Sequence, residues 1–252
     1  KYDDGYTLLM GAENPQMYKV LGLGDMDYND MITINILARG TPVFVARNDA
    51  PYSNMQEFTD FVKAHPGELK IGSTGNGGLT SIVMAMLQSQ ISLDYTSIPY
   101  NGDGPALTAL QGGAIDVMPA VLGATIEQIK AGRMKVIGLV DKEANKLLPG
   151  VAPITDTFPG LKSYLPWGPF FGIFVKQGTP DDVVKKLQGA FQQAAFHPDF
   201  IDLMQKRGFT ILNISGEEAN YFLSGYRSTS SWLVHEAGFS KRSPEEFNIP
   251  RP

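Results

Sequence analysis

A glycine-rich segment in the first third of the chain has the composition of an anion-binding turn. The stretch IGSTGNGGLTS, residues 71–81, lies between a short apolar run and an amphipathic one. Glycine lets the backbone adopt positive φ and approach a ligand closely, and the segment contains Gly72, Gly75, Gly77 and Gly78. Neutral hydrogen-bonding side chains are supplied by Ser73, Thr74, Asn76, Thr80 and Ser81. The segment can therefore surround a small anion with amides and hydroxyl groups.

The residues after this turn predict a helix whose N-terminus faces the same anion. Apolar side chains recur at helical spacing at Ile82, Val83, Met86 and Leu87. Amides left unpaired in the first helical turn, with a dipole effect of about 0.3–1 kcal/mol, attract a carboxylate or a phosphate. The turn can hold an anion without a cation. The alternative is a plain strand-to-helix connection that binds nothing.

Nucleotide binding does not fit the details of the segment. A P-loop requires Lys and then Ser or Thr after its last glycine, whereas Leu79 follows Gly78. The glycine spacing of a dinucleotide fold is also absent, and the next acidic residue, Asp94, is at no obvious strand end.

Two further segments repeat the order of strand, loop and helix. They are IPYNGDGPALTALQGG, residues 98–113, and VMPAVLGATIEQIKAG, residues 117–132. In open α/β sheets, ligands bind beyond the carboxyl ends of the strands. We expect the three loops to converge on one cleft, which favours anion binding over a plain connection.

The bulk composition excludes several classes of protein. The chain has 252 residues and a net charge of −5, with 43% hydrophobic and 19% charged residues, which predicts an ordinary globular protein with two lobes. Lys and Arg are scattered, so no basic stripe for nucleic acid is present. No apolar run reaches the roughly 18 residues of a membrane span. With zero cysteines, disulfides, thiolate metal sites and Cys nucleophiles are excluded, which is compatible with an exported bacterial protein.

The three histidines do not indicate a metal site. His65, His197 and His235 are far apart in the sequence, and the first two precede proline at predicted helix ends. Such positions are typical of solvated caps, and the spacing of metal ligands is absent. We expect no metal and no cofactor.

The elements that must position these loops alternate between strands and helices, which predicts an α/β fold with parallel sheets and crossover helices. The expected strands are residues 6–10, 32–38, 43–47, 69–72, 96–99, 114–118, 134–140, 172–176 and 209–213. The expected helices are residues 54–64, 80–90, 105–111, 125–131, 180–196, 198–207 and 216–237.

Two segments share the order of strand, basic residue, turn, proline, amphipathic helix and His-Pro. These are residues 43–66 and 172–198. One interpretation is that any two strand-helix units of an α/β protein look alike. The other is that both strands cross between lobes, so that residues 1–42 and 174–252 form lobe 1 and residues 43–173 form an inserted lobe 2.

Several linked motifs, taken in order, resemble one family of transport proteins. The segments are DGYTLL, GSTGNG, PYNGDGPALTALQGGAIDV, IKAGRMKVIGL, LPGVAPITD and FVKQGTPDDVVKKLQ. The chain resembles, over nearly its whole length, the substrate-binding receptors of tripartite tricarboxylate transporters of the Bug/TctC type. The resemblance implies a two-lobed type II periplasmic-binding-protein fold with mainly parallel sheets and two crossing hinge strands.

The resemblance also implies which residues bind the ligand. In the first lobe the positions are Gly11, Ala12, Glu13 and Asn14, after the GYTLLM strand. In the second lobe they are Ser73, Thr74, Gly75, Asn76, Gly77, Thr80 and Ser81, then Tyr100, Asn101, Gly102, Asp103 and Gly104, then Val121 and Leu122 in the loop 120–123. Trp167 begins an aromatic segment that extends to Phe170, just before the returning hinge strand.

The chain departs from the family pattern in three respects. Family members carry a further strand-helix-strand unit before DGYTLL, so either the sequence is N-terminally incomplete or the first lobe is built differently. We expect the former, because losing the unit would expose a sheet edge. Asn101 and Asp103 replace the common Lys and a small residue, and Glu13 replaces a hydroxyl or amide, which argues against a citrate-like polyanion. No Arg or Lys is present in residues 72–81 or 99–106, so recognition should use neutral hydrogen bonds and water.

The expected function is that of an extracytoplasmic, periplasmic receptor whose signal peptide has been removed. It would capture a small carboxylate (a di- or tricarboxylate, an aromatic acid or an acidic amino acid) by closing like a Venus flytrap, and deliver it to the membrane subunits of a tripartite transporter. An ammonium group on the ligand could face Glu13 or Asp103. The alternatives are an enzyme, for which the loops offer only those two acids and no nearby His or Cys, and the ligand-sensing domain of a regulator.

Overall fold

The chain folds into two compact units in a computed structural model that describes residues 3–75 and 77–252. Unit 1 consists of Lys1–Gly40 and Pro169–Pro252, and unit 2 of Thr41–Gly168. The sequence placed the two boundaries at 42/43 and 173/174. The structure assigns residues 41–42 to unit 2 and residues 169–173 to unit 1, because these residues pair with the strands of those units.

The sheet of unit 1 is antiparallel in every pairing of its described strands, in the order β1-β8-β2-β9. Its strands are β1 (Leu9–Ala12), β2 (Met31–Arg39), β8 (Phe170–Lys176) and β9 (Thr210–Ile214). The prediction of parallel pairing is wrong for this sheet. β8 enters between β1 and β2 only after the chain has passed through all of unit 2, so no local crossover helix fixes a parallel direction.

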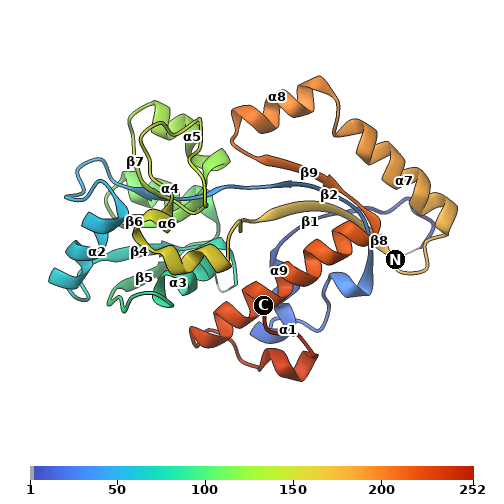
Figure 1. Cartoon of the computed structure of the whole chain (residues 1–252), viewed down its shortest axis with the longest axis horizontal. Helices are drawn as coiled ribbons and strands as arrows, with labels where there is room; N and C mark the ends of the chain where they lie inside the picture. Colours follow the sequence, from blue (N-terminus) through green and yellow to red (C-terminus); the bar gives the residue numbers. More distant parts are fainter. Residues whose placement is uncertain (1–2, 76) are drawn as a thin grey trace. The chain divides into compact units, whose positions relative to one another are not determined.

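Helices cover both faces of this sheet (Figure 1). The helices of unit 1 are α1 (Tyr18–Leu21), α7 (Asp181–Ala194), α8 (Pro198–Lys206) and α9 (Gly216–Glu236), with short 3₁₀ turns η1 (Asn14–Met17), η2 (Tyr28–Asp30) and η4 (Pro244–Phe247). On one face α7 packs against Ile34, Ile173 and Val175. On the other face α9 places the Tyr226 ring edge-on to Phe170, with centroids 5.0 Å apart.

The sheet of unit 2 is mixed, in the order β5-β4-β6-β3-β7. Its strands are β3 (Pro42–Ala46), β4 (Lys70–Ser73), β5 (Thr96–Pro99), β6 (Val117–Val121) and β7 (Lys135–Leu139). β4 is parallel to β5 and β6, as the alternating pattern predicts, whereas β3 is antiparallel to both of its neighbours. Parallel pairing is therefore confirmed only among β4, β5 and β6, which follow one another along the chain through α3 and α4.

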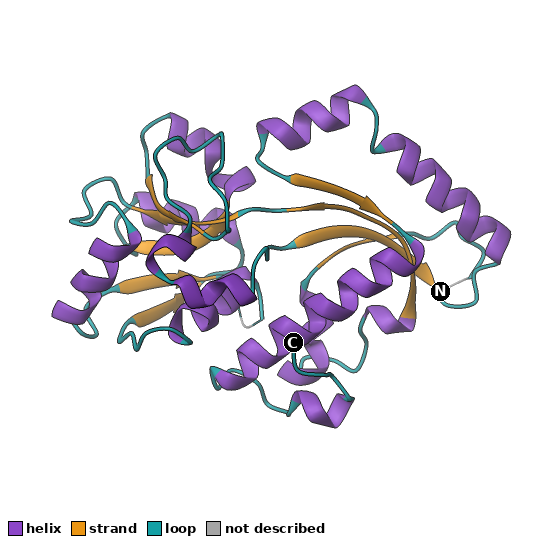
Figure 2. Cartoon of the chain, viewed as in Figure 1, coloured by secondary structure: helices purple, strands orange, loops and turns teal. Residues whose placement is uncertain are grey.

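The helices of unit 2 pack on this sheet, as the purple and orange elements of Figure 2 show. They are α2 (Met55–Ala64), α3 (Leu79–Gln88), α4 (Asp103–Gln111), α5 (Leu122–Lys130) and α6 (Ile154–Thr157), with the 3₁₀ turn η3 (Pro159–Ser163). The core includes fully buried Val43, Leu110, Met118 and Ala120. In the described residues no helix has the length and apolar character needed to cross a bilayer.

The predicted crossing strands each belong to a single unit. β3 lies in unit 2 and β8 in unit 1, so the chain passes from one unit to the other just before each strand, after Gly40 and after Gly168. Within unit 1 the two chain segments are held together by a 2.7 Å hydrogen bond from the Gly40 amide to the Pro169 carbonyl. The expectation that the strands themselves cross is corrected accordingly.

Candidate functional site

Three helices of unit 2 begin at one edge of its sheet. Because β4, β5 and β6 are parallel, their carboxyl ends lie at the same edge. α3 follows β4, α4 follows β5 and α5 follows β6. The N-cap residues Gly78, Gly102 and Val121 make no side-chain cap in the part of the chain that the structure describes. The three loops therefore lie at the same edge of the unit 2 sheet, with three helix N-termini, and the cleft predicted there stays a prediction.

The turn between β4 and α3 is held by its hydroxyl groups. Thr80, 2% exposed, donates from Oγ1 to the Pro119 carbonyl of β6 at 3.5 Å and lies 3.5 Å from Thr74 Oγ1. Ser81 Oγ donates to the Gly75 carbonyl at 3.0 Å. Thr80 therefore ties the helix to the sheet, and Ser81 fixes the shape of the turn.

The glycines of this turn leave its backbone open. Gly75 has φ +100, and a Cβ atom added there would meet nothing within 4 Å. Gly77 also has positive φ, at 80°. The predicted contact Asn76 is outside the described residues. Space beside Gly75 and an uncapped helix start are what a backbone anion site requires.

The turn between β5 and α4 combines an open backbone with one acid. The Tyr100 amide donates to the Ser73 carbonyl at 2.7 Å, which joins this turn to the first one. Gly102 (φ +105) and Gly104 would each have open space around an added Cβ, and Asn101 is exposed. Asp103 is partly buried, and this burial raises the pKa of its carboxyl group. The described residues show no hydrogen-bonding or charged partner for that carboxylate.

The third turn offers less to a ligand than the other two. The Leu122 amide donates to the Thr41 carbonyl at 2.9 Å, and its side chain is fully buried. Thr125 Oγ1 donates back to the carbonyls of Val121 and Leu122, at 3.3 and 3.1 Å. Of the two predicted contacts here, Leu122 is used by the fold, while Val121 stays partly exposed.

The predicted first-lobe loop lies in unit 1, directly after β1. Tyr28 Oη donates to the Ala12 carbonyl at 2.6 Å, and Asn14 begins η1. Glu13 is only 5% exposed. Burial, and then the Glu13 charge, raise the pKa values of both Tyr28 and Tyr226, so the carboxylate lies near these two rings.

Arg39 is a buried, charged residue near Tyr226 that the sequence analysis did not select. It ends β2 and is 8% exposed, and its charge opposes that of Glu13 in setting the pKa of Tyr226. An arginine at the end of a largely apolar strand, immediately before Gly40, was the available signal. Trp167, in unit 2, is 2% exposed, and the segment it begins leads directly into β8.

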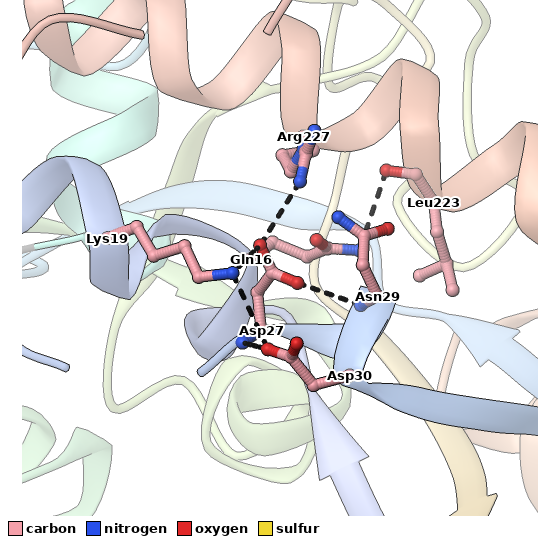
Figure 3. Close-up of polar contacts among 7 residues, drawn as sticks. All are labelled: Gln16, Lys19, Asp27, Asn29, Asp30, Leu223 and Arg227. Atoms are coloured by element: carbon pink, nitrogen blue, oxygen red, sulfur yellow. Dashed lines mark hydrogen bonds and ion pairs between the residues drawn. The ribbon is translucent and has the colours of Figure 1, made fainter. Parts of the chain in front are cut away.

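An ion-pair cluster anchors the segment that follows the first-lobe loop (Figure 3). Asp27, 2% exposed, lies 3.2 Å from Lys19 Nζ and 3.1 Å from Arg227 Nη1. Its carboxylate also accepts from the Asn29 amide at 2.8 Å, and its own amide donates to Asp30 at 2.9 Å. Because Arg227 belongs to α9, the cluster fixes the segment between β1 and β2 to the C-terminal helix.

Metal binding has no support among the described residues, where no group of three or more His, Asp or Glu side chains could hold an ion. The histidines take part in local contacts instead. His65 Nδ1 lies 3.0 Å from the Phe61 carbonyl, His197 accepts from the Asp199 amide at 3.3 Å, and His235 Nδ1 lies 2.7 Å from Ser240 Oγ.

The chain is similar in sequence to a set of receptor proteins. The family model described as "Tripartite tricarboxylate transporter family receptor" matches residues 2–239. A UPF0065 protein of Bordetella pertussis is 28% identical over 240 residues, which are 93% of this chain and 72% of that protein.

Solved structures share the fold. MatC (Rpa3494) from Rhodopseudomonas palustris with bound malate has a TM-score of 0.80 and 22% identity, and the match covers 93% of this chain and 81% of that one. R. palustris Rpa4515 with adipate has a TM-score of 0.82 and 17% identity, over 94% of this chain and 80% of that one. These matches confirm the predicted two-lobed α/β fold class.

Proposed function

The chain belongs to the tripartite tricarboxylate transporter receptor family, and we propose that it captures a small carboxylate outside the cytoplasm and delivers it to the membrane subunits of such a transporter. The family consists of solute-binding receptors, so the chain is a binding protein and not an enzyme. Carboxylate capture is supported by MatC and Rpa4515, which carry malate and adipate.

The single observation that carries this proposal is the gathering of three uncapped helix N-termini at one edge of the unit 2 sheet. Neutral hydrogen bonds contribute about 0.5–1.5 kcal/mol each, whereas a micromolar ligand requires about 8 kcal/mol. Several amides and hydroxyls must therefore act together. The turns at residues 73–81 and 100–104 supply them, and Val121 in the third turn and the unit 1 residues Ala12–Asn14 belong to the same proposal.

Within the carboxylates, we favour ligands of low net charge or with a hydrogen-bond donor. Asp103 is an unpaired carboxylate among the described residues and lies at the first position of α4. Glu13 adds a second negative charge to the proposed set. Like charges oppose binding, so malate, adipate or an acidic amino acid suits these positions better than citrate.

Thermal-shift and calorimetric titrations with malate, adipate, citrate, benzoate and glutamate test the proposal. A ligand at 100 times its Kd stabilises the folded state by about 2.7 kcal/mol, which for a chain of this size raises Tm by about 5–10 °C. We expect this for at least one dicarboxylate and a smaller rise with citrate. The proposal is wrong if the folded protein shows neither a shift nor a binding heat with any of them.

A further inference from the structure

Unit 2 contains a cavity at the sheet edge opposite the carboxylate turns. β3 is antiparallel to β6, so Ala46 at the end of β3 pairs with Val117 at the start of β6, while the candidate turns follow the other end of β6. The cavity, of about 410 Å³, is lined by Arg47, Asn48 and Asp49 after β3, by residues 110–113 at the end of α4, and by Arg133 after α5. A ligand in the proposed carboxylate site would leave this edge accessible.

The two arginines of the cavity differ in how they are neutralised. Arg47 donates from Nε and Nη2 to the Asp49 carboxylate at 2.9 and 3.1 Å, and its Nη1 lies 3.5 Å from Asp116. Arg133 donates from Nε to the neutral Gln128 side chain. The described residues show no carboxylate paired with Arg133, which is exposed. One guanidinium is thus shared between two acids, and the other faces solvent with its terminal nitrogens available.

The helix ends beside the cavity explain why cations lie there, but not how Arg133 is used. α4 ends at Gln111 and α5 at Lys130, and helix C-termini favour positive charge. The hydrogen bond that the structure shows for the Arg133 guanidinium goes to a side-chain amide, not to a carbonyl of either helix end. The Arg133 guanidinium therefore caps neither helix end, and its charge is available to a ligand.

The strength of exposed ion pairs decides what kind of ligand the cavity can hold. One exposed pair strengthens binding only about 1.4- to 5-fold, so a free monoanion held by Arg133 alone would bind too weakly to be retained. The volume is within the range of about 300–1,000 Å³ found for ligand sites. The exposed polar lining, with Asn48 and Gln111 beside Arg133, suits a chain that makes several such contacts at once.

We propose that this cavity, centred on Arg133, is a docking site for an acidic segment of a partner protein. Arg133 pairs with an Asp or Glu side chain of the partner, and Gln111 donates a hydrogen bond to a neighbouring residue of it. Asn48 Nδ2 already donates to the Gly132 carbonyl, so only its second N–H is left for the partner. Asp49 limits the affinity, because it competes for Arg47 and repels the incoming carboxylate. The inference does not depend on the carboxylate site.

The test is a fluorescence-anisotropy titration of the whole protein with a labelled polyglutamate peptide at about 10 mM salt, where the Debye length is about 30 Å. The net charge of −5 opposes such a peptide, so binding requires a local positive site. We expect Arg133→Gln to weaken binding about 5-fold and Asp49→Asn to strengthen it about 2- to 3-fold. Lys186→Gln, on α7 of unit 1, removes the same charge from an exposed position and should change binding less than about 1.5-fold.

Circular dichroism confirms that each variant is folded, which positions outside the core should allow. Absence of peptide binding by the wild type overturns the inference, as does equal binding by Arg133→Gln, or equal weakening by Lys186→Gln. Inorganic phosphate provides the last arm. If phosphate displaces the peptide at an equal concentration of charge, the cavity is a site for small oxyanions, and the proposal of a protein partner is overturned.

Discussion

The loop segments of the two units use opposite chemistry. In unit 2 the turn at residues 73–81 has neutral side chains, and Gly75 in it has open space beside it. In unit 1 the region around Glu13 and Asp27 contains buried charges, two buried tyrosines and a cluster of ion pairs. A neutral turn can accept an anion without first breaking internal pairs, whereas buried ion pairs hold a segment in one position. In the proposed function, unit 2 therefore provides the adaptable contacts to the ligand, and the ion pairs of unit 1 hold its loop segment in one position.

The largest effect should come from breaking the charged cluster of unit 1. Asp27→Ala leaves Lys19 and Arg227 without their buried partner and removes an acceptor from the Asn29 amide. Breaking a buried pair costs about 3–5 kcal/mol, and we expect about 3 because the two cations are 24% and 18% exposed. Urea unfolding measures the loss.

Glu236→Gln is the matched control for this prediction. It removes an exposed pair with Arg251, 2.8 Å long, and should cost less than about 1 kcal/mol. If both variants lose the same stability, the cluster contributes no more than a surface pair, and the contrast between a rigid unit 1 and an adaptable unit 2 is lost.

The next prediction compares substitutions at two glycines, one tightly packed by its neighbours and one with open space around it. A Cβ at Gly11 would lie 2.2 Å from Tyr28 Oη, so Gly11→Ala should destabilise the fold by about 1–3 kcal/mol through overpacking. Gly104 has open space and is inside α4, so Gly104→Ala should be neutral or stabilise by up to about 1 kcal/mol. Thermal unfolding separates the two, and equal Tm changes would contradict the packing around Tyr28.

The sequence predicted the positions of helices and strands well, but it did not predict which strands pair with one another. Apolar periodicity located α7 and α9 to within two residues, and the glycines of residues 72–78 marked the turn at the start of α3. The antiparallel sheet of unit 1 escaped prediction because β8 joins β2 from a distant part of the chain. A local pattern carries no information about which strand will be the neighbour.

The same limit applies to the site. Ser73–Ser81 was selected because its residue types act locally, through backbone freedom and hydroxyl groups. The environment of Glu13 could not be predicted, because Tyr28 and Tyr226 come near it only through the fold of unit 1. Likewise, nothing near Leu122 in the sequence shows that Thr41 takes its amide.

A smaller effect is expected from Asp103, the acid within the neutral turns. Burial raises its pKa, so the protonated form is favoured in the folded state. This stabilises the fold at pH below the ordinary value of 3.8 and is lost as pH rises through the raised pKa. Asp103→Asn should therefore be more stable than the wild type at pH 7, with the gain disappearing in acid. Thermal unfolding from pH 3 to 7 measures the difference, and a constant difference would exclude Asp103 as its source.

The same substitution sharpens the contrast in ligand binding. Removal of the like charge should strengthen the binding of malate or adipate about 1.4- to 5-fold, the effect of one exposed charge pair. Glutamate should gain less, because its ammonium group can offset the Asp103 charge. If calorimetry shows the same gain in affinity for malate and glutamate, the charge of Asp103 does not distinguish between these ligands.

The smallest effect concerns the shape of the first turn. Ser81→Ala removes the 3.0 Å hydrogen bond to the Gly75 carbonyl and should cost less than about 1 kcal/mol of stability. Without it, Gly75 can rotate its amide away from the anion, so affinity for the best carboxylate of the panel should fall about 2- to 5-fold. Ser97→Ala, on exposed β5 with no described hydrogen bond from its side chain, should leave both unchanged. If Ser81→Ala loses stability but keeps its affinity, Ser81 stabilises only the fold, and other groups of the turn bind the ligand.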